Sequence, residues 1–384
     1  MSQKFGMIYF HNFSNEDIVW GLLLLGKDVE IISTDLERSS TSEEDAFFLS
    51  NELKEKEIDI AISYDFCPAL SDACMKNGIK YVSWIFDSPL QMLFEKQVSN
   101  NCNYIFSFDK RQIEQTKSLF NCNIYYMPLG TNLTRNTAIE MNDADKHKFA
   151  CDVSFIGNLY SEKEYKAALL TVSDKTKTEL EYIWKNVYGK WDGTDRLYGQ
   201  LTKNALEELK EKLGNSTAMD DDTLFVTALI VKAMAHKERK EMLERLSGYE
   251  LYFYTNDKNV ALSGVSTKGG LDYIEELPKA YRFSKINLNI TMRGITSGIP
   301  LRVFDIMGMG GFTLTNYQPE VYELFSPGKD IEVYHDFSEM EEKVSYYLKN
   351  GNIREKIANA GAQTVKEKYS VENQVQKILE VVLR

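Results

Sequence analysis

The sequence has few of the residues that build disulfides or metal sites. Its 384 residues include five cysteines and four histidines, and no two cysteines have the Cys-x-x-Cys spacing of a zinc or redox motif. An odd number of cysteines, all placed before residue 152, is typical of buried thiols in a reducing compartment. We therefore expect free cysteines, no bound metal and a cytoplasmic location.

Long hydrophobic runs and excess positive charge are also lacking. The longest apolar run is about six residues, whereas a helix that crosses a bilayer needs about 20. Glu16 and Asp17 interrupt the apolar residues near the N-terminus, so this stretch does not have the pattern of a signal peptide. The 45 Lys and Arg against 57 Asp and Glu give a net charge of −12. This charge argues against nucleic acid as the main partner, although a local basic pocket for one diphosphate is still allowed.

Strand-like and helix-like segments alternate through residues 1–148. Six short runs rich in Ile, Val, Tyr and Phe predict buried strands at 4–10, 28–34, 58–65, 79–87, 102–109 and 123–130. Helix-like segments separate most of these runs, a pattern typical of a mainly parallel α/β sheet. We expect residues 1–148 to form one Rossmann-like domain, and we interpret its polar end, residues 133–148, as a linker.

A second α/β unit is predicted from residue 149 to residue 368. Its expected strands are 151–158, 249–255, 285–291, 311–317 and 330–336. Residues 160–248 are charged and mostly helical, which predicts a helical insertion between the first two of these strands. The apolar faces of its helices fit an acceptor-binding surface, a core of its own or a dimer contact, and the sequence does not separate the three. The helix at 369–384 is expected to pack back on the N-terminal domain.

The segment 292–317 has the pattern of an anion-binding site. A loop follows the strand that ends near Thr291, and a helix then starts with Pro300 in its first turn, where proline fits. Free N–H groups and the positive end of the helix dipole would face a ligand over the sheet. Arg302 can bind phosphate oxygens, and Asp305 on the same helical face can accept hydrogen bonds from ribose hydroxyls. The candidate binding residues are Arg293, Thr296, Ser297, Gly298, Arg302 and Asp305.

The same segment has a plainer interpretation. Arg302 and Asp305 would then form an exposed salt bridge, and the glycines would only make turns.

Further binding candidates come from strand ends, where open α/β sheets bind ligands. Gly157 and Asn158 end the first strand of the second unit, and glycine there permits close approach of a diphosphate. The alternative is an ordinary turn. Tyr254 and Thr255 end the next strand and are placed to flank a nucleotide base, although a core tyrosine is an equal alternative.

Two residues of the first domain are candidates for a general base. Asp87 ends the strand 79–87, and a carboxylate there can take a proton from an acceptor hydroxyl. Its alternative role is to cap the next helix. His11 follows the first strand, and imidazole titrates near neutrality; the alternative is a plain structural histidine. Asp65, at the end of the third strand, is a weaker candidate of the same kind.

An acidic run, Asp220 to Asp222, precedes a helix-like segment. Some enzymes bind a divalent metal through an Asp-x-Asp pair. We interpret the run instead as a helix cap that complements the helix dipole.

Several segments resemble one family. Residues 298–348 and 353–379 are similar to the C-terminal half of group-1-type glycosyltransferases of the CgeB-like (spore maturation protein) branch. The segments YVSWIFDSP (81–89) and YYMPLGTN (125–132) resemble the domain that accompanies this branch, and DVSFIGNLY (152–160) resembles the start of its C-terminal domain. The resemblance does not cover the insertion at 160–248.

The resemblance implies the GT-B fold, in which two Rossmann-like domains face a cleft and the C-terminal domain holds most of a nucleotide-sugar. Asp305 stands where related enzymes carry a ribose-binding Glu, and Arg302 would fit the diphosphate. Gly298 stands where relatives carry an acidic residue that contacts the donor sugar. The group-1 likeness favours retention of the anomeric configuration, while Gly298 and Asp87 keep inversion open.

These observations together predict a glycosyltransferase of the hexosyl- or N-acetylhexosaminyl-transferase class. We expect a nucleoside-diphosphate sugar as donor, most readily a UDP-sugar, with no cofactor required. The expected acceptor is a glycan or a protein, such as a surface glycan, a flagellin-like protein or a spore-coat component. Two alternatives are a non-catalytic nucleotide- or sugar-binding protein, which the missing carboxylate at position 298 suggests, and an epimerase that acts on the nucleotide-sugar itself.

Overall fold

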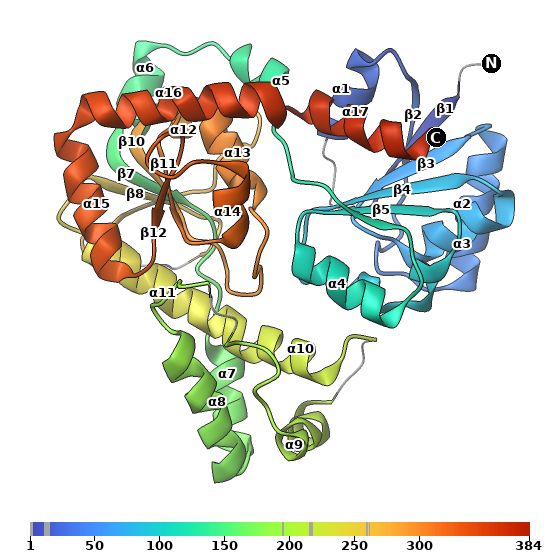
Figure 1. The fold of residues 1–384 in the computed structure, drawn as a ribbon, viewed down its shortest axis with the longest axis horizontal. Helices are drawn as coiled ribbons and strands as arrows, with labels where there is room; N and C mark the ends of the chain where they lie inside the picture. The colour runs from blue at the N-terminus through green and yellow to red at the C-terminus, as the bar shows by residue number, and fades with distance from the viewer. Residues whose placement is uncertain (1–2, 11–15, 194–195, 215–217, 259, 261) are drawn as a thin grey trace. The chain divides into compact units, whose positions relative to one another are not determined.

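The computed structural model describes residues 3–10, 16–193, 196–214, 218–258, 260 and 262–384 (Figure 1). The chain divides into two compact units. The first contains residues 1–132, 297–301 and 368–384, and the second contains residues 133–296 and 302–367.

The first unit is built on a parallel sheet of six strands in the order β2-β1-β3-β4-β5-β6. The strands are β1 (Lys4–Tyr9), β2 (Asp28–Ser33), β3 (Ile60–Tyr64), β4 (Lys80–Ile85), β5 (Asn103–Ser107) and β6 (Ile124–Tyr126). The six strands predicted for this unit are confirmed. Because β3 to β5 are buried almost throughout, they read as continuous apolar runs, as strands covered on both faces do.

Helices cover both faces of this first sheet. Figure 1 shows α1 (Asp17–Leu24) and α17 (Val371–Val382) on one face, with α2 (Glu43–Glu55), α3 (Pro68–Asn77) and α4 (Lys110–Leu119) on the other. The C-terminal helix α17 packs on α1 so closely that a Cβ added at Gly21 would lie 2.8 Å from Val375. Two short 3-10 helices, Gln91–Phe94 and Lys96–Ser99, connect β4 to β5.

The second unit contains another parallel sheet of six strands, in the order β12-β11-β10-β7-β8-β9. Its strands are β7 (Cys151–Ile156), β8 (Leu251–Tyr254), β9 (Ser266–Lys268), β10 (Ser284–Asn289), β11 (Thr313–Asn316) and β12 (Glu332–Tyr334). Five of them were predicted. The edge strand β9 was missed, because its three residues Ser-Thr-Lys carry no apolar pattern.

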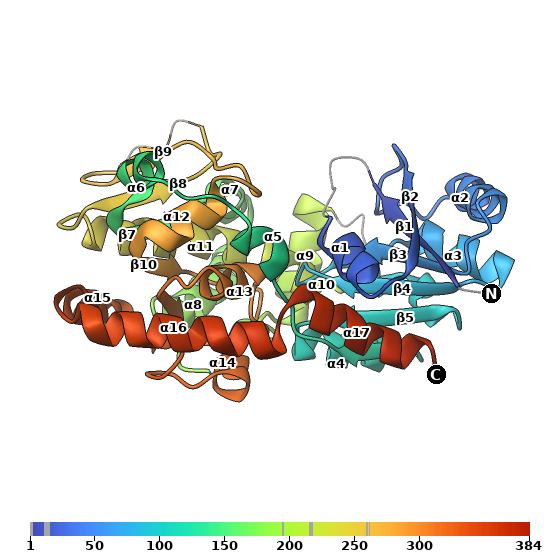
Figure 2. The ribbon, with the colours of Figure 1, turned by 90° about the horizontal axis from the view of Figure 1, so that it is seen from above.

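Helices α12 (Leu277–Phe283) and α13 (Leu301–Gly308) cover one face of the second sheet, and Figure 2 shows α12 over β7 and β10. On the other face, α11 (Lys232–Arg245) and α15 (Phe337–Lys349) share one hydrophobic core with the strands. The remaining helices of the unit's C-terminal part are α14 (Pro319–Leu324) and α16 (Gly351–Lys368). In the part of the chain that the structure describes, no helix has both the length and the apolar character needed to cross a bilayer.

The predicted helical insertion is confirmed between β7 and β8. It contains α7 (Lys163–Thr171), α8 (Asp174–Val187), α9 (Lys203–Leu213), α10 (Asp221–Phe225), a π-helical turn (Val226–Val231) and α11. Its apolar faces meet in a separate core that includes Leu180, Leu209 and Ile230. At least part of its apolar pattern therefore serves its own packing.

The acidic run 220–222 lies at the start of α10. Asp220 accepts a hydrogen bond from the Thr223 N–H at the start of α10, so the acidic run 220–222 is a helix cap, as predicted.

Residues 133–148, which we interpreted as a linker, instead form α5 (Leu133–Thr137) and most of α6 (Asp143–Phe149). Asn142 and Asp145 form a capping box at the start of α6, and this pairing stabilises a helix too short to show a hydrophobic period.

Candidate functional site

The candidate anion site of the second unit lies at the carboxyl end of its sheet. Asn289 is the last residue of β10, and Gly157 follows directly after β7, its neighbour in the sheet. Ligands of open α/β sheets bind beyond this end of the strands.

Arg302, the second residue of α13, reaches this edge. Its Nη1 donates a hydrogen bond of 3.1 Å to the Asn289 Oδ1 atom. A Cβ added at Gly157 would lie 3.1 Å from Arg302 Nη2, and Gly157 has a φ of +157°, which side chains rarely adopt. The glycine therefore makes room for the guanidinium, so the structure brings together two residues that were predicted from separate segments.

Arg239, on α11, is a second guanidinium at the same edge that sequence reasoning missed. It is only 4% exposed, and it donates hydrogen bonds to the backbone oxygens of Asn158 and Ile290. Burial lowers the pKa of Arg239 to about 10; Tyr160 opposes this shift, and the nearby charge of Arg302 contributes to it. The surrounding sequence, AHKERKEML, has the charge pattern of a solvated helix, and nothing in it distinguishes Arg239 from its neighbours.

The two guanidiniums flank one aromatic ring and lack acidic partners. The Phe155 ring centroid lies 5.4 Å from the Arg239 Cζ atom and 5.7 Å from the Arg302 Cζ atom. Among the described residues, no carboxylate lies within ion-pair distance of either arginine. Buried charge is costly unless it is compensated, so this edge of the sheet is a natural place for an anion.

A polar network continues from Arg302 along the sheet edge. The Asn289 Nδ2 atom donates hydrogen bonds of 2.9 Å to Thr291 Oγ1 and 2.8 Å to Thr315 Oγ1. The Thr291 N–H in turn donates a hydrogen bond of 2.7 Å to Asn316 Oδ1. These residues fix the orientation of the amide group that holds Arg302.

Arg293, another predicted binding residue, is already paired. Its guanidinium contacts the buried carboxylate of Glu238 at 2.6 Å and donates to the backbone oxygen of Lys190. Its charge is therefore largely compensated within the second unit.

The loop residues predicted beside Arg293 have different surroundings. Ser297 Oγ donates a hydrogen bond of 2.7 Å to Asp109 and accepts the Lys110 N–H at 3.1 Å, and residues 297–301 cluster with the first unit. A Cβ added at Gly298 would lie 2.6 Å from the Phe108 ring, so no side chain fits there. The Thr296 hydroxyl is buried without a partner. Donor binding by these three residues stays a prediction.

The residues that were predicted to contact the nucleoside are buried. Asp305 is 4% exposed on α13. Tyr254 is also 4% exposed, and it packs with Phe149 and Ala280 in a small core cluster. Thr255 accepts a hydrogen bond from the Asp257 N–H at 3.0 Å. The ribose contact of Asp305 and the base contacts of Tyr254 and Thr255 stay predictions.

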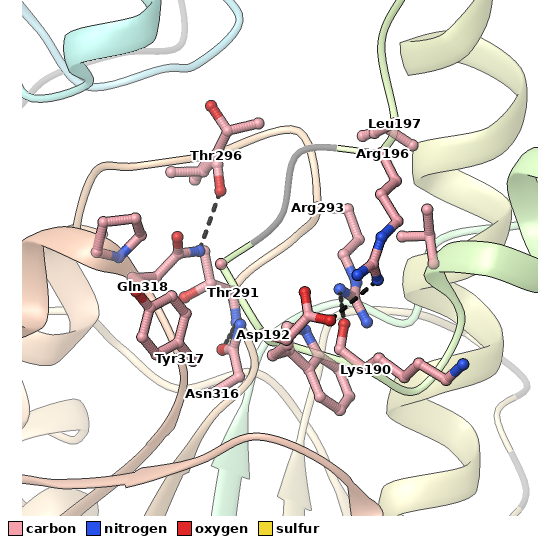
Figure 3. A pocket seen from close by; sticks show the side chains of 15 residues that line it. Lys190, Asp192, Arg196, Leu197, Thr291, Arg293, Thr296, Asn316, Tyr317 and Gln318 are labelled. Atoms are coloured by element: carbon pink, nitrogen blue, oxygen red, sulfur yellow. Dashed lines mark hydrogen bonds and ion pairs between the residues drawn. The ribbon is translucent and has the colours of Figure 1, made fainter. Parts of the chain in front are cut away.

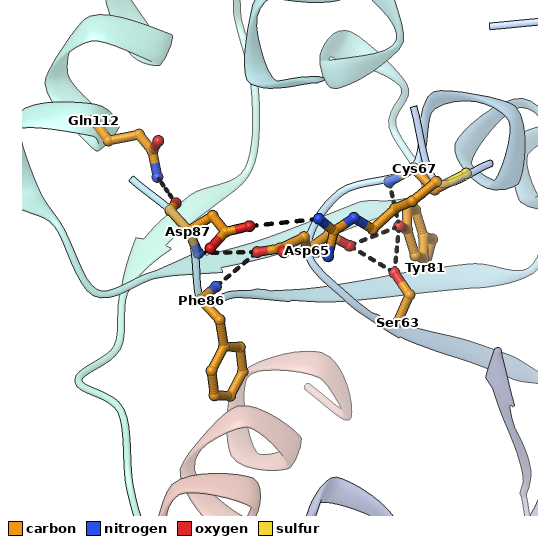
Figure 4. Close-up of polar contacts among 8 residues, drawn as sticks. Ser63, Asp65, Cys67, Tyr81, Phe86, Asp87 and Gln112 are labelled. Atoms are coloured by element: carbon orange, nitrogen blue, oxygen red, sulfur yellow. Dashed lines mark hydrogen bonds and ion pairs between the residues drawn. The ribbon is translucent and has the colours of Figure 1, made fainter. Parts of the chain in front are cut away.

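The first unit places its candidate base in a cluster of charged groups (Figure 4). The Asp87 side chain is 63% exposed and lies 3.4 Å from Arg38 Nη2. Asp87 caps no described helix, because the 3-10 helix that follows has Leu90 at its N-cap. His11 lies outside the described residues.

Asp65 is the buried partner in this cluster. Its Oδ1 accepts the N–H groups of Phe86 at 2.7 Å and Asp87 at 3.2 Å, and its Oδ2 accepts from Arg38 Nη1 at 2.5 Å. Burial and then the charge of Asp87 raise the pKa of Asp65 to about 7, although Arg38 and the two N–H groups oppose this. The Asp65 carboxylate thus fixes the backbone at Phe86 and Asp87 through these two hydrogen bonds.

The raised pKa of Asp65 predicts how stability depends on pH. The ordinary value is 3.8, so between about pH 4 and about pH 7 the folded chain holds a proton that the unfolded chain has lost. The free energy of unfolding should therefore fall as pH rises through this window and then level off. Urea denaturation at several pH values measures this slope. In the Asp65→Asn variant the slope should be flatter, and an unchanged slope would assign it to other groups.

Among the described residues, no group of three or more His, Cys, Asp or Glu side chains has an arrangement that could hold a metal ion. The cysteines are all free.

Part of the second half of the chain matches a known protein family. Residues 228–380 match the model of a family described as glycosyl transferase-like, which confirms the predicted resemblance for this part of the chain. No curated protein matches the chain significantly in sequence.

Solved structures extend the likeness to the whole chain. A glycosyltransferase from Rickettsia africae is similar with a TM-score of 0.56 at 12% identity, over 99% of this chain and 98% of that one. The T4 phage beta-glucosyltransferase in complex with UDP-glucose has a TM-score of 0.52 at 12% identity, over 99% of both chains. Anabaena HepE in complex with UDP-glucose has a TM-score of 0.53 at 10% identity, again over 99% of both chains. At such low identity these matches establish the fold alone, and the predicted GT-B fold of two Rossmann-like units is confirmed.

Proposed function

We propose that this protein is a glycosyltransferase that takes a sugar from a nucleoside-diphosphate sugar. The observation that carries the proposal is the pair of guanidiniums, Arg239 and Arg302, without acidic partners at the carboxyl end of the second sheet. In such a site the leaving diphosphate gains charge as the glycosidic bond breaks, and fixed cations stabilise that charge. Gly157 leaves the room beside Phe155 that the Arg302 guanidinium occupies.

UDP-glucose is the ligand named for two proteins of the same fold. This supports a UDP-sugar as the first donor to test, and a hexosyl or N-acetylhexosaminyl group as the one transferred. For the acceptor we propose a glycan or protein hydroxyl, with Asp87 as the general base that removes its proton. If Asp87 is the general base, the anomeric configuration of the sugar should be inverted. The group-1 likeness instead favours retention. The anomeric configuration of the product distinguishes the two mechanisms.

A panel of UDP-, GDP- and dTDP-sugars tests the proposal. We expect at least one donor, or its free nucleoside diphosphate, to raise the thermal unfolding temperature, because a ligand that binds only the folded state stabilises it. The same donor should be consumed in a product assay with glycan and protein acceptors. If no donor or nucleotide stabilises the protein, the proposal fails.

A non-catalytic binding protein is the second candidate. It is favoured by Gly298, because the contact with Phe108 leaves no space there for a carboxylate side chain. Nucleotide binding without transfer or donor hydrolysis over a broad acceptor panel would support it.

A further inference from the structure

Arg239 has little contact with solvent, although the candidate anion site depends on its charge. Only 4% of the residue is exposed, and its guanidinium lies over two aromatic rings. The Arg239 Cζ atom is 5.4 Å from the centre of the Phe155 ring and 4.9 Å from the centre of the Tyr160 ring. Phe155 is fully buried, whereas Tyr160 is 37% exposed. The Tyr160 ring is therefore on the solvent side of the guanidinium.

Tyr160 has an unusual backbone conformation. It stands four residues after the end of β7, in the loop that leads to α7, and its φ is +65°. For a bulky side chain this left-handed conformation is a genuine outlier, because the Cβ atom comes too close to the following carbonyl oxygen. Such strain lasts only where the surroundings enforce it, and it is concentrated at ligand sites and switches.

The surroundings of Tyr160 hold its backbone and leave its ring free to turn. The Leu159 N–H donates a hydrogen bond of 2.6 Å to Asp257 Oδ2, and the Leu159 side chain lies in the core of the second sheet. The backbone oxygen of Tyr160 lies 3.3 Å from His236 Nδ1. None of these contacts involves the Tyr160 ring, so the ring can change rotamer while the loop stays in place.

An aromatic ring is a weaker partner for a guanidinium than a phosphate group is. The ring attracts the cation only through its quadrupole, whereas a phosphate carries full charge and can accept two N–H groups of one arginine. Among the described residues, the Arg239 guanidinium contacts aromatic rings and the backbone oxygens of Asn158 and Ile290, and it has no carboxylate partner. A diphosphate can therefore displace the Tyr160 ring.

Arg293, a third arginine near this end of the sheet, provides a contrast. It lines a pocket in which it points toward Lys190 and donates a hydrogen bond to that residue's backbone oxygen (Figure 3). Its guanidinium also contacts the buried Glu238 carboxylate at 2.6 Å and lies over the Trp191 ring. A full negative charge already compensates Arg293, so an anion gains little there. Arg239 has a ring in place of the carboxylate, and an anion can replace a ring.

We propose that Tyr160 controls the access of an anion to Arg239. Its ring covers the guanidinium, and a diphosphate reaches Arg239 after the ring has turned aside. The inference rests on the proposed function for the identity of the anion, a nucleoside diphosphate. Because Tyr160 acts through Arg239, it is a positioning residue and not a catalytic one.

Three variants separate the Tyr160 ring from the backbone that carries it. Tyr160→Phe keeps an aromatic ring over the guanidinium. Tyr160→Asn and Tyr160→Gly remove the ring, and both residues tolerate a left-handed backbone, so the loop should keep its shape. Tyr182→Asn, which removes an exposed tyrosine from α8 of the same unit, is the matched control.

Phenylglyoxal reacts with accessible guanidiniums, so the rate at which it modifies Arg239 measures the cover directly. If the ring stands aside in about a tenth of the molecules, its removal should speed this modification about tenfold. We expect that increase in Tyr160→Asn and Tyr160→Gly, with rates close to wild type in Tyr160→Phe and Tyr182→Asn. Peptide mass spectrometry follows Arg239 beside the exposed Arg282, which should react equally in all the proteins. Equal rates at Arg239 would overturn the inference.

Calorimetric titration with UDP and with inorganic pyrophosphate tests the effect on binding. Without the ring every molecule is competent to bind, so the Kd of both ligands should fall about tenfold in Tyr160→Asn and Tyr160→Gly. Tyr160→Phe and Tyr182→Asn should bind both ligands as the wild type does. An unchanged or higher Kd in the Asn and Gly variants would also overturn the inference.

Failure of the proposed function has a different signature. In that case neither UDP nor pyrophosphate binds the wild type or any variant. The phenylglyoxal rates then decide the role of Tyr160 alone: faster modification of Arg239 in the Asn and Gly variants supports the cover, and equal rates overturn it.

Discussion

Replacing Arg302 by alanine is expected to lower kcat/KM for the nucleotide-sugar by about 100- to 1,000-fold, the range found when one preorganised donor to a developing negative charge is removed. The guanidinium rests on Asn289 and beside Gly157, without an acidic partner to compete for it. Most of the loss should appear in kcat, because the charge on the leaving diphosphate grows as the sugar departs. Steady-state kinetics over a range of donor concentrations separates kcat from KM.

The matched control is Arg282→Ala. Arg282 is an exposed arginine on α12 of the same unit, and its contact is a long hydrogen bond to the Gly310 oxygen. This variant loses the same charge without touching the site and should keep wild-type kinetics. Equal losses in the two variants would mean that net charge, rather than the position of Arg302, matters.

Changing Asp87 to asparagine should lower kcat by about 100- to 10,000-fold if it removes the proton from the acceptor. The amide has nearly the same shape but cannot take a proton. Asp87 is exposed, and Asp65 and Arg38 hold it from behind, so the fold should survive the change. Donor affinity should stay at the wild-type level, and the product assay at saturating acceptor measures kcat.

Asp28→Asn provides the comparison, because Asp28 is an exposed carboxylate at the opposite, N-terminal end of a strand in the same sheet. NMR of the product adds an independent readout through its anomeric configuration. A retained configuration with normal turnover in Asp87→Asn would show that Asp87 is not the base.

The alternation of strands and helices made most of the fold predictable. Buried parallel strands such as β3 and β4 are continuous apolar runs, and the charged helices between β7 and β8 contain no competing strand pattern. The three polar residues of β9 lacked this signal. The helices α5 and α6 were also missed, because a capping box and not a hydrophobic period stabilises α6.

The candidate site was predictable only where a local sequence pattern singles out a residue. Gly157 ends a strand-like run and Arg302 follows a proline at the start of a helix, so both carry such a pattern, and the structure brings them to one place. Arg239 does not, because its role arises from the packing of α11 across the sheet, which places its guanidinium beside Phe155 and under the oxygen of Ile290. Ser297 was singled out from its position in a polar loop; its hydroxyl binds Asp109, and its contact with a donor stays a prediction.

A crystal structure of the protein with UDP tests the central claim most directly. The account predicts that the diphosphate lies at the carboxyl end of the β7–β10 pair, with its oxygens within hydrogen-bond distance of the guanidiniums of both Arg239 and Arg302. A UDP molecule bound elsewhere, with both arginines untouched, would contradict it.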